Sequence, residues 1–200
     1  DVYKRQEVDI LADCGAYAGL APDVMGVSAM RSDNLQRLTN VRTRARMVYT
    51  HTMPRGAFRG FGGTQMLFAL NSHMQVMADR LGMDVFDLHR RNMTRAGDLT
   101  VHDWQVGSCA LPECLDHIES AIGWAARKAR PKGRGILRRG VGMGIAMHVS
   151  GNRIIGNWDG STILLKINED GRAVVHTGES DMGQGAFTML AQICAQELGI

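Results

Sequence analysis

The sequence predicts an α+β protein in two parts, each built from strand, glycine-rich loop and helix in that order, with mixed sheets and flanking helices. Segments rich in β-forming residues alternate with segments whose apolar residues recur every three or four positions. Two clusters of glycine each lie between a strand-like and a helix-like segment. A basic stretch with proline and glycine separates the two parts and is typical of a linker.

Two strands are expected in the first part. Glu7 to Tyr17 (EVDILADCGAY) predicts a buried strand that runs into a glycine turn, and Val41 to Thr52 (VRTRARMVYTHT) predicts a second strand that ends before Pro54. Asp9 and Asp13 lie on one face of the first strand, because side chains two residues apart point the same way. We expect these carboxylates to serve hydrogen bonds of the turn rather than acid–base catalysis.

Three helices are expected next. The first follows the glycine run 56–63 (GAFRGFGG), with Thr64 as its N-cap, and ends at Gly82. Its apolar stripe is Met66, Leu70, Met74, Met77 and Leu81. Asp84 is placed to cap a short second helix. Pro112 suits the first turn of a third helix, whose apolar stripe is Leu115, Ile118, Ile122 and Ala125.

The second part has a β pattern. Beyond the linker 129–139, residues 140–149 alternate with glycine and predict a strand. Residues 162–168 and 172–177 flank a Glu-Asp-Gly turn and predict a β-hairpin. A second glycine loop, 178–185 (GESDMGQG), leads into a final helix.

Composition excludes several classes of protein. The chain has 200 residues, 44% of them hydrophobic, and a formal net charge of +3 that is too small and evenly spread to indicate nucleic-acid binding. No apolar run reaches the roughly 18 residues of a membrane span. The 4 cysteines are dispersed, which favours a reduced, cytoplasmic protein over a disulfide framework. The histidines show no zinc-binding spacing.

The two glycine loops carry the chemistry. A loop that leads directly into a helix exposes backbone N–H groups at the positive end of the helix dipole, which suits an anion. Arg59 adds a planar fork for oxyanions, and Phe61 a flat surface for a planar substrate. Gln184, between two glycines, can both donate and accept, which suits a polar heteroaromatic ligand. For either loop alone, a purely structural turn is the simpler interpretation.

At these residues the chain resembles the molybdopterin-binding large subunit of the xanthine dehydrogenase, aldehyde oxidase and 4-hydroxybenzoyl-CoA reductase family. The resemblance rests on the runs ADCGAY, VYTHTMPRGAFRGFGGTQ, ADRLGMDVFDLHRRN and VVHTGESDMGQG. It implies an internal fragment of that subunit. Residues 7–130 would then be the C-terminal part of one molybdopterin-binding domain, and 131–200 the N-terminal part of the next. We interpret residues 1–6 (DVYKRQ) as a remnant of sequence assembly.

The resemblance also implies roles for individual residues. Arg59 is implied to lie beside the ligands of the molybdenum, and Phe61 to lie against the ring of the substrate. The implied cofactor contacts are Phe58, Arg59, Gly60, Gly183, Gln184 and Gly185. The general-base glutamate of the family is expected beyond Ile200, so no catalytic residue lies in this chain and the fragment alone should be inactive.

The implied activity is that of a molybdenum hydroxylase, an oxidoreductase that uses water to oxidise an aldehyde or an N-heteroaromatic carbon. Its cofactor would be molybdenum–molybdopterin, in the plain or the cytosine dinucleotide form. Iron–sulfur clusters of the 2Fe–2S type and FAD are expected on partner subunits or domains of a hetero-oligomer in the cytoplasm, without nucleic acid or a membrane span.

Other functions stay open at this point. The stretch GDLTVHDWQVGSC resembles the 4-hydroxybenzoyl-CoA reductase branch, in which the same centre works reductively on an aromatic acyl-CoA. A non-catalytic paralogue or scaffold would keep the fold without the metal. An unrelated nucleotide-binding enzyme could use DMGQG as its phosphate loop. By contrast, the run Gly140-Val-Gly-Met-Gly144 lacks the spacing of a dinucleotide-binding motif.

Overall fold

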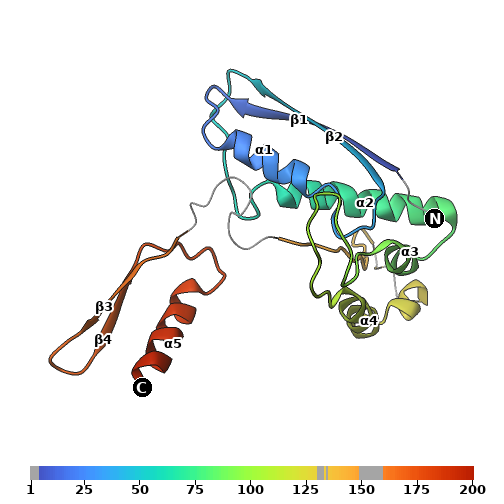
Figure 1. The fold of residues 1–200 in the computed structure, drawn as a ribbon. Coiled ribbons are helices and arrows are strands. Elements are labelled where there is room, and N and C mark those ends of the chain that lie inside the picture. The colour runs from blue at the N-terminus through green and yellow to red at the C-terminus, as the bar shows by residue number, and fades with distance from the viewer. Residues whose placement is uncertain (1–4, 130–132, 134, 149–159) are drawn as a thin grey trace. The chain divides into compact units, whose positions relative to one another are not determined.

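The computed structural model describes residues 5–129, 133, 135–148 and 160–200. The described residues contain both helices and strands, which confirms the predicted α+β class (Figure 1). The elements are β1 (Arg5–Gly15), α1 (Ala21–Met30), β2 (Asn40–Tyr49), α2 (Gly63–Leu81), α3 (Val85–Asn92), α4 (Leu111–Ala121), the 3₁₀ helix η1 (Trp124–Ala129), β3 (Ile163–Ile167), β4 (Ala173–Thr177) and α5 (Ala186–Leu198). Among the described helices, none is long and apolar enough to cross a membrane. The chain divides into two compact units, 1–148 and 149–200.

In the first unit, β1 and β2 form a parallel pair, with Asp9 opposite Arg44 (Figure 1). One face of β1 turns towards the helices, because Gln6 is buried while its neighbours Arg5 and Glu7 are exposed. On the exposed face Asp9 forms ion pairs with Arg44 and Arg46 of β2. The expectation that Asp9 serves the turn is therefore wrong. Both strands lie close to their predicted bounds.

Helix α1 contacts both strands and α2, and the sequence did not predict it. Its segment, APDVMGVSAM, is apolar nearly all round, so it lacks the polar face that marks an amphipathic helix. Pro22 suits its first turn. The buried side chains Ala21, Met25 and Ser28 follow each other at helical spacing. Because α1 spans the gap between β1 and β2, it provides the crossover that a parallel pair needs.

Helix α2 begins one residue before the predicted N-cap. Gly62 occupies the N-cap position with a positive φ of 88°, and Gly63 already belongs to the helix. The hydroxyl of Thr64 contacts Gln65 rather than a backbone N–H, so its predicted role as N-cap is wrong. The helix ends at Gly82, whose φ of 62° is typical of a C-terminal cap, as predicted.

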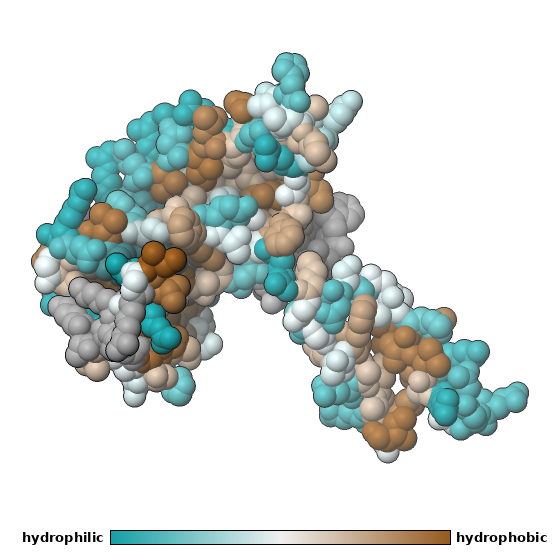
Figure 2. All heavy atoms as spheres, turned by 180° about the vertical axis from the view of Figure 1, so that it is seen from behind, coloured by the Kyte–Doolittle hydropathy of each residue, from teal (hydrophilic) through white to brown (hydrophobic). Residues whose placement is uncertain are grey.

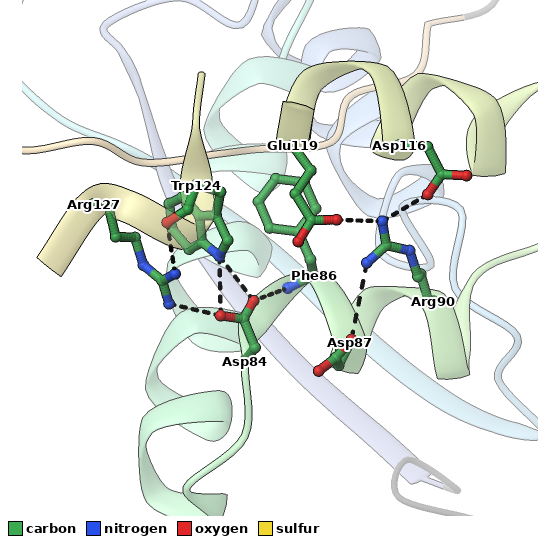
Figure 3. A network of polar contacts seen from close by, with 8 residues as sticks. All are labelled: Asp84, Phe86, Asp87, Arg90, Asp116, Glu119, Trp124 and Arg127. Atoms are coloured by element: carbon green, nitrogen blue, oxygen red, sulfur yellow. Dashed lines mark hydrogen bonds and ion pairs between the residues drawn. The ribbon is translucent and has the colours of Figure 1, made fainter. Parts of the chain in front are cut away.

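The apolar core of the first unit lies between the C-terminal half of α2, α3, α4 and η1. It consists of Met74, Ala78, Val85, Phe86, Leu88, Met93, Leu115, Trp124 and Ile145. As predicted, Asp84 caps α3, where its side chain accepts a hydrogen bond from the backbone N–H of Phe86. Trp124 and Arg127 also donate to Asp84, with distances of 2.9 and 2.6 Å to Oδ2 (Figure 3). A polar network therefore joins the start of α3 to η1.

The predicted strand 140–149 is absent from its described residues, 140–148, which contain no strand. Instead the backbone of Ile145 bonds to side chains: its N–H donates to Asn71 at 2.8 Å, and its carbonyl accepts from Asn71 and Asn34 at 2.8 and 3.2 Å. Asparagine amides offer the donor and acceptor that a neighbouring strand would provide. Val149 lies outside the described residues.

In the second unit, β3 and β4 pair antiparallel, with Leu165 opposite Val175, and α5 contacts β4. The hairpin and the helix that follows it are confirmed. Many apolar side chains of this unit are exposed, and they gather on its surface in Figure 2. The largest exposed ones are Ile163, Leu164, Ile167, Val174, Met182, Phe187, Met189, Ile193, Leu198 and Ile200.

Candidate cofactor-binding loops

The segment that leads into the first glycine loop is organised by Asp13 at the end of β1. One oxygen of Asp13 accepts from the N–H of Gly15 at 2.7 Å and from the hydroxyl of Thr50 at 2.6 Å. The other accepts from Thr52 and from Arg55, at 3.3 and 3.0 Å. The hydrogen bond from Thr50, with that from the Gly15 N–H, lowers the pKa of Asp13. The expectation that Asp13 serves the turn is confirmed.

The first glycine loop, 56–63, turns sharply just before α2. Three successive residues, Gly60, Phe61 and Gly62, have positive φ angles of 98°, 46° and 88°. The N–H of Phe61 donates to the carbonyl of Phe58, and the N–H of Gly63 to that of Gly60, both at 2.8 Å. A non-glycine residue with positive φ is uncommon, so the fold holds Phe61 in a strained conformation.

Steric contacts explain one of these glycines. A Cβ on Gly62 would lie 2.2 Å from the carbonyl oxygen of Val24 in α1, so no other residue fits without moving the backbone. Gly56 is different, because a Cβ there meets nothing within 4 Å. Glycine at position 62 therefore serves the packing of the loop on α1, whereas glycine at 56 has no such role among the described residues.

The structure places Phe58, Arg59, Gly60 and Phe61 in this one turn. The side chain of Phe58 is 85% exposed, Arg59 is also exposed, and Phe61 is half-buried. An exposed phenylalanine next to an exposed guanidinium offers a planar apolar surface and a cationic fork on the same loop. Both side chains are accessible to a ligand.

A buried polar segment that includes Arg31 and Asp33 packs against the start of α2. The Cγ of Arg31 lies 3.6 Å from the position of a Cβ on Gly63, and only 3% of Arg31 is exposed. Its guanidinium lies over the ring of Trp104, 5.8 Å from the centroid. Burial raises the pKa of the nearby Asp33 and lowers that of Arg31. No motif in the sequence indicated this cluster.

The second glycine loop, 178–185, is organised by Asp181. Its Oδ1 accepts from the N–H groups of Gly183 and Gly185, at 2.7 and 3.4 Å. The N–H of Gly183, followed by the N–H groups of Gly185, Phe187 and Ala186, lowers the pKa of Asp181. A carboxylate of the chain itself therefore lies at the positive end of α5, where the sequence predicted an external anion.

Gln184 also contributes to the shape of the second loop. Its Oε1 accepts from the N–H of Met182 at 2.7 Å, and its Nε2 donates to the carbonyl of Ser180 at 2.8 Å. A glutamine amide has two donors and two acceptor positions, so these bonds use one of each. Gln184 is exposed, and its remaining donor and acceptor can serve a ligand. Gly183 and Gly185, with φ angles of 103° and 80°, flank it.

Sequence reasoning identified the loops but missed Asp181. The sequence did contain a signal for it. An aspartate two residues before a glycine, as Asp181 is before Gly183, is typical of a turn in which the carboxylate accepts from the backbone N–H two residues on. Among the described residues, no group of three or more histidine, cysteine, aspartate or glutamate side chains is placed to hold a metal ion. The side-chain groups that these loops offer to a ligand are an amide, a guanidinium and aromatic rings.

Comparison with known families assigns the chain to a family. Two family profiles, each described as a molybdopterin cofactor-binding domain, match residues 4–93 and 117–200. The first contains the glycine loop 56–63 and the second contains the loop 178–185. The chain belongs to the molybdopterin cofactor-binding family.

Curated relatives of this molybdopterin-binding chain include two bacterial proteins. It is 30% identical to the xanthine dehydrogenase molybdenum-binding subunit of Escherichia coli O157:H7, over 98% of this chain and 26% of that protein. It is 31% identical to the aldehyde oxidoreductase of Megalodesulfovibrio gigas, over 90% of this chain and 20% of that protein. The chain thus spans about a quarter or less of the length of these relatives.

Solved structures agree with this assignment. The molybdopterin-binding chain matches the aldehyde oxidoreductase of Desulfovibrio gigas with a TM-score of 0.69 and 29% identity, over 91% of this chain and 20% of that one. It matches quinoline 2-oxidoreductase from Pseudomonas putida 86 with a TM-score of 0.73 and 21% identity, over 98% of this chain and 27% of that one. The second likeness shows the fold alone.

Proposed function

We propose that each of the two glycine loops contributes contacts to a molybdenum–pterin cofactor. We further propose that the whole protein is a xanthine dehydrogenase-type hydroxylase, oxidising an aldehyde or N-heteroaromatic carbon with oxygen taken from water. The observation that carries the proposal is the match of two molybdopterin cofactor-binding profiles, each containing one exposed glycine loop. Relatives named xanthine dehydrogenase and aldehyde oxidoreductase support the class of reaction.

The described residues fit such a cofactor. A pterin is a polar heteroaromatic ring with several donors and acceptors, and Gln184 keeps one donor and one acceptor outside its own loop. A phosphate or a ligand of the metal is an oxyanion, for which an arginine fork is suited, and Arg59 is exposed. Neither loop has to open for these groups to reach a ligand.

We assign roles to the loop residues accordingly. Arg59, with the backbone of Gly60 and the ring of Phe58, would hold the metal end of the cofactor, and Phe61 would orient the ring of the substrate. The backbone of Gly183 and Gly185, with the amide of Gln184, would contact the pterin. When bound, the cofactor supplies the two-electron redox chemistry, while these residues bind and orient it. The general-base glutamate would come from another part of the full protein.

Further components follow from the same proposal. Electrons leaving the cofactor need a carrier, so we propose 2Fe–2S clusters and FAD on partner subunits or domains, in a cytoplasmic hetero-oligomer. The pterin would be present in the plain or the cytosine dinucleotide form.

Isotope labelling tests the reaction. The full-length protein is purified with its partners and incubated with an aldehyde or an N-heteroaromatic compound in water enriched in heavy oxygen, with an artificial electron acceptor. The proposal expects the label in the product and reduction of the acceptor. Product oxygen that comes from dioxygen would contradict it, as would the absence of turnover in a protein loaded with molybdenum.

The reductive branch is the second candidate, because the stretch GDLTVHDWQVGSC resembles it. The same purified protein, given a reduced electron donor and an aromatic acyl-CoA, would then remove the ring hydroxyl of the substrate as water. Hydroxylation without any such reduction assigns the chain to the oxidative branch.

A further inference from the structure

Helix α5 begins without a capping side chain of its own. Gly185 occupies the N-cap position with a φ of 80°, it makes no side-chain cap hydrogen bond, and the first turn holds no acidic residue. The first N–H groups of a helix need acceptors, since no carbonyl within the helix reaches them. In this chain Asp181, four residues before the N-cap, accepts from the N–H of Gly185 at 3.4 Å. The N–H of Gly183 lowers the pKa of Asp181, and the N–H groups of Phe187 and Ala186 also lower it.

We propose that Asp181 is a positioning residue for the cofactor: its carboxylate is the built-in anion that holds Gly183, Gln184 and Gly185 in the form that receives the pterin. This inference rests on the proposed function and goes beyond it, because Asp181 belongs to none of the contacts assigned above. It acts through the loop rather than on the ligand.

The geometry gives the carboxylate this role. Oδ1 of Asp181 accepts from Gly183 on one side of Gln184 and from Gly185 on the other. The backbone of Gln184 is therefore fixed at both neighbours. Its side chain then closes the same loop through Met182 and Ser180. Without the carboxylate, two glycines with positive φ would regain their freedom to rotate, because glycine loses more conformational freedom on folding than other residues.

The charge matters as well as the shape. Acceptors that are ionised form stronger hydrogen bonds with backbone N–H groups than neutral acceptors do. The negative charge also complements the positive end of α5. Because Asp181 already accepts from the N–H groups of Gly183 and Gly185, contacts of this loop with the pterin fall to the carbonyl groups of these glycines and to the remaining donor and acceptor of Gln184. The loop is thereby suited to a neutral heteroaromatic ring.

Chemical rescue tests the proposal in the full-length protein purified from its natural host. Molybdenum and pterin content are measured for the wild type and for Asp181→Ala, each prepared with and without added formate. We expect Asp181→Ala to lose cofactor by about tenfold, the effect of one charge-assisted hydrogen-bonding group. We expect formate, a carboxylate small enough for the vacated position, to restore most of the cofactor.

Asp170→Ala is the matched control. Asp170 closes the β3–β4 turn in the same manner, accepting from the N–H of Arg172 at 3.0 Å, but it lies in the hairpin and not in the glycine loop. Its loss should leave the cofactor content unchanged. If Asp181→Ala does not accumulate as folded protein, Asp181→Asn replaces it, and the rate of cofactor release is compared with that of the wild type.

The outcomes separate this inference from the proposed function. A wild type that contains no molybdenum and no pterin contradicts the proposed function. A wild type with cofactor, together with Asp181→Ala at the same content, overturns the role of Asp181. Loss of cofactor that formate does not reverse overturns it too, because a general structural defect has no need of a carboxylate. In the asparagine variant, an unchanged release rate overturns the role and a faster one supports it.

Discussion

Arg59 and Gln184 are the two side chains on which the proposed cofactor site depends most directly. Arg59 is exposed and directly precedes three residues with positive φ, whereas Gln184 is tied to its own loop by two hydrogen bonds. Their positions within the two glycine loops predicted both residues as cofactor contacts. The turn role of Asp13 was predicted from the sequence, whereas that of Asp181 became clear only from hydrogen-bond geometry.

Replacing Arg59 tests the first loop at the level of one side chain. Arg59→Ala should lower molybdenum content or turnover by at least about tenfold, because a preorganised cationic donor near the reacting centre is lost. Arg80→Ala is the control, since Arg80 is an exposed arginine in the last turn of α2. Unchanged molybdenum content together with an unchanged rate would show that the role assigned to Arg59 is wrong.

His89 predicts a pH dependence of stability. It lies in α3 with 1% of its surface exposed, and burial lowers its pKa from 6.5 to about 4. The unfolded chain then binds a proton below pH 6.5 while the folded chain does not. The contribution of the neutral histidine to the free energy of unfolding is therefore fully present above pH 6.5. It is lost as the pH falls towards 4, and the loss is on the order of 3 kcal/mol.

Thermal melts of the full-length protein between pH 7.5 and 4.5 measure this effect. His89→Gln cannot take up the proton, so its melting temperature should fall less on acidification than that of the wild type. His117→Gln, which replaces an exposed histidine of α4, should behave as the wild type does. Parallel curves for wild type and His89→Gln would contradict the prediction.

At the scale of elements, the contact between the first glycine loop and α1 fixes where α2 starts. Gly62→Ala would force a Cβ to within 2.2 Å of the Val24 carbonyl, at a φ of 88°. It should destabilise the protein by at least about 2 kcal/mol and lower cofactor content. Gly56→Ala, in the same loop but with open space around it, should leave both unchanged. Equal unfolding midpoints for the two variants would contradict this account.

The network around Asp84 joins α3 to η1 (Figure 3). Partial burial opposes its ionisation, but hydrogen bonds from Trp124, Phe86 and Arg127 together lower the pKa of Asp84. Arg127 also lies 3.8 Å from the centroid of the Trp124 ring. A second network, with Arg90 donating to Asp116 and Glu119 of α4, lies beside it. Both tie α3 to the elements that follow it.

Asp84→Ala removes a helix cap and the acceptor of Trp124 and Arg127 at once. It should cost about 2 kcal/mol of unfolding free energy. Asp87→Ala, in the first turn of the same helix, removes only an exposed ion pair with Arg90 at 3.8 Å, and should cost less than about 0.5 kcal/mol. Chemical denaturation of both variants checks the difference. A cost for Asp84→Ala no larger than that for Asp87→Ala would sink the proposed link between α3 and η1.

The elements whose apolar residues recur at a regular spacing, or that contain a turn motif, were predicted, and the others were not. The spacing of Met66 and Met74 indicated α2, and the Glu169-Asp170-Gly171 turn indicated the hairpin. Helix α1 has no polar face, so no periodicity could reveal it. Residues 140–148 have the residue pattern of a strand, but side-chain amides of Asn71 and Asn34 take the place of a partner strand. Such long-range pairing is invisible in a local window.

At the scale of the whole molecule, the exposed apolar surface is the dominant feature. In the second unit Leu164 is 67% exposed and Ile167 is 60% exposed, and further apolar side chains gather there (Figure 2). Apolar surface of this extent marks contacts with other protein segments. The named relatives match this chain over only 20 to 26% of their own length, and we expect segments outside the matched region to cover this surface.

Expression of the chain without any further segments tests whether this apolar surface contacts other protein segments. A protein consisting of residues 7–200 should aggregate or bind a hydrophobic dye strongly, whereas the full-length protein should not. Light scattering and dye fluorescence measure both. A monodisperse monomer with a sharp unfolding transition would contradict the interpretation.

The central claim is that the glycine loops of this chain bind a molybdenum–pterin cofactor. Elemental and pterin analysis of the intact, full-length protein tests it most directly. We expect molybdenum and pterin in equal amounts, with both falling together in Arg59→Ala and in Gln184→Ala. A protein purified with a bound nucleotide and without molybdenum would contradict the claim.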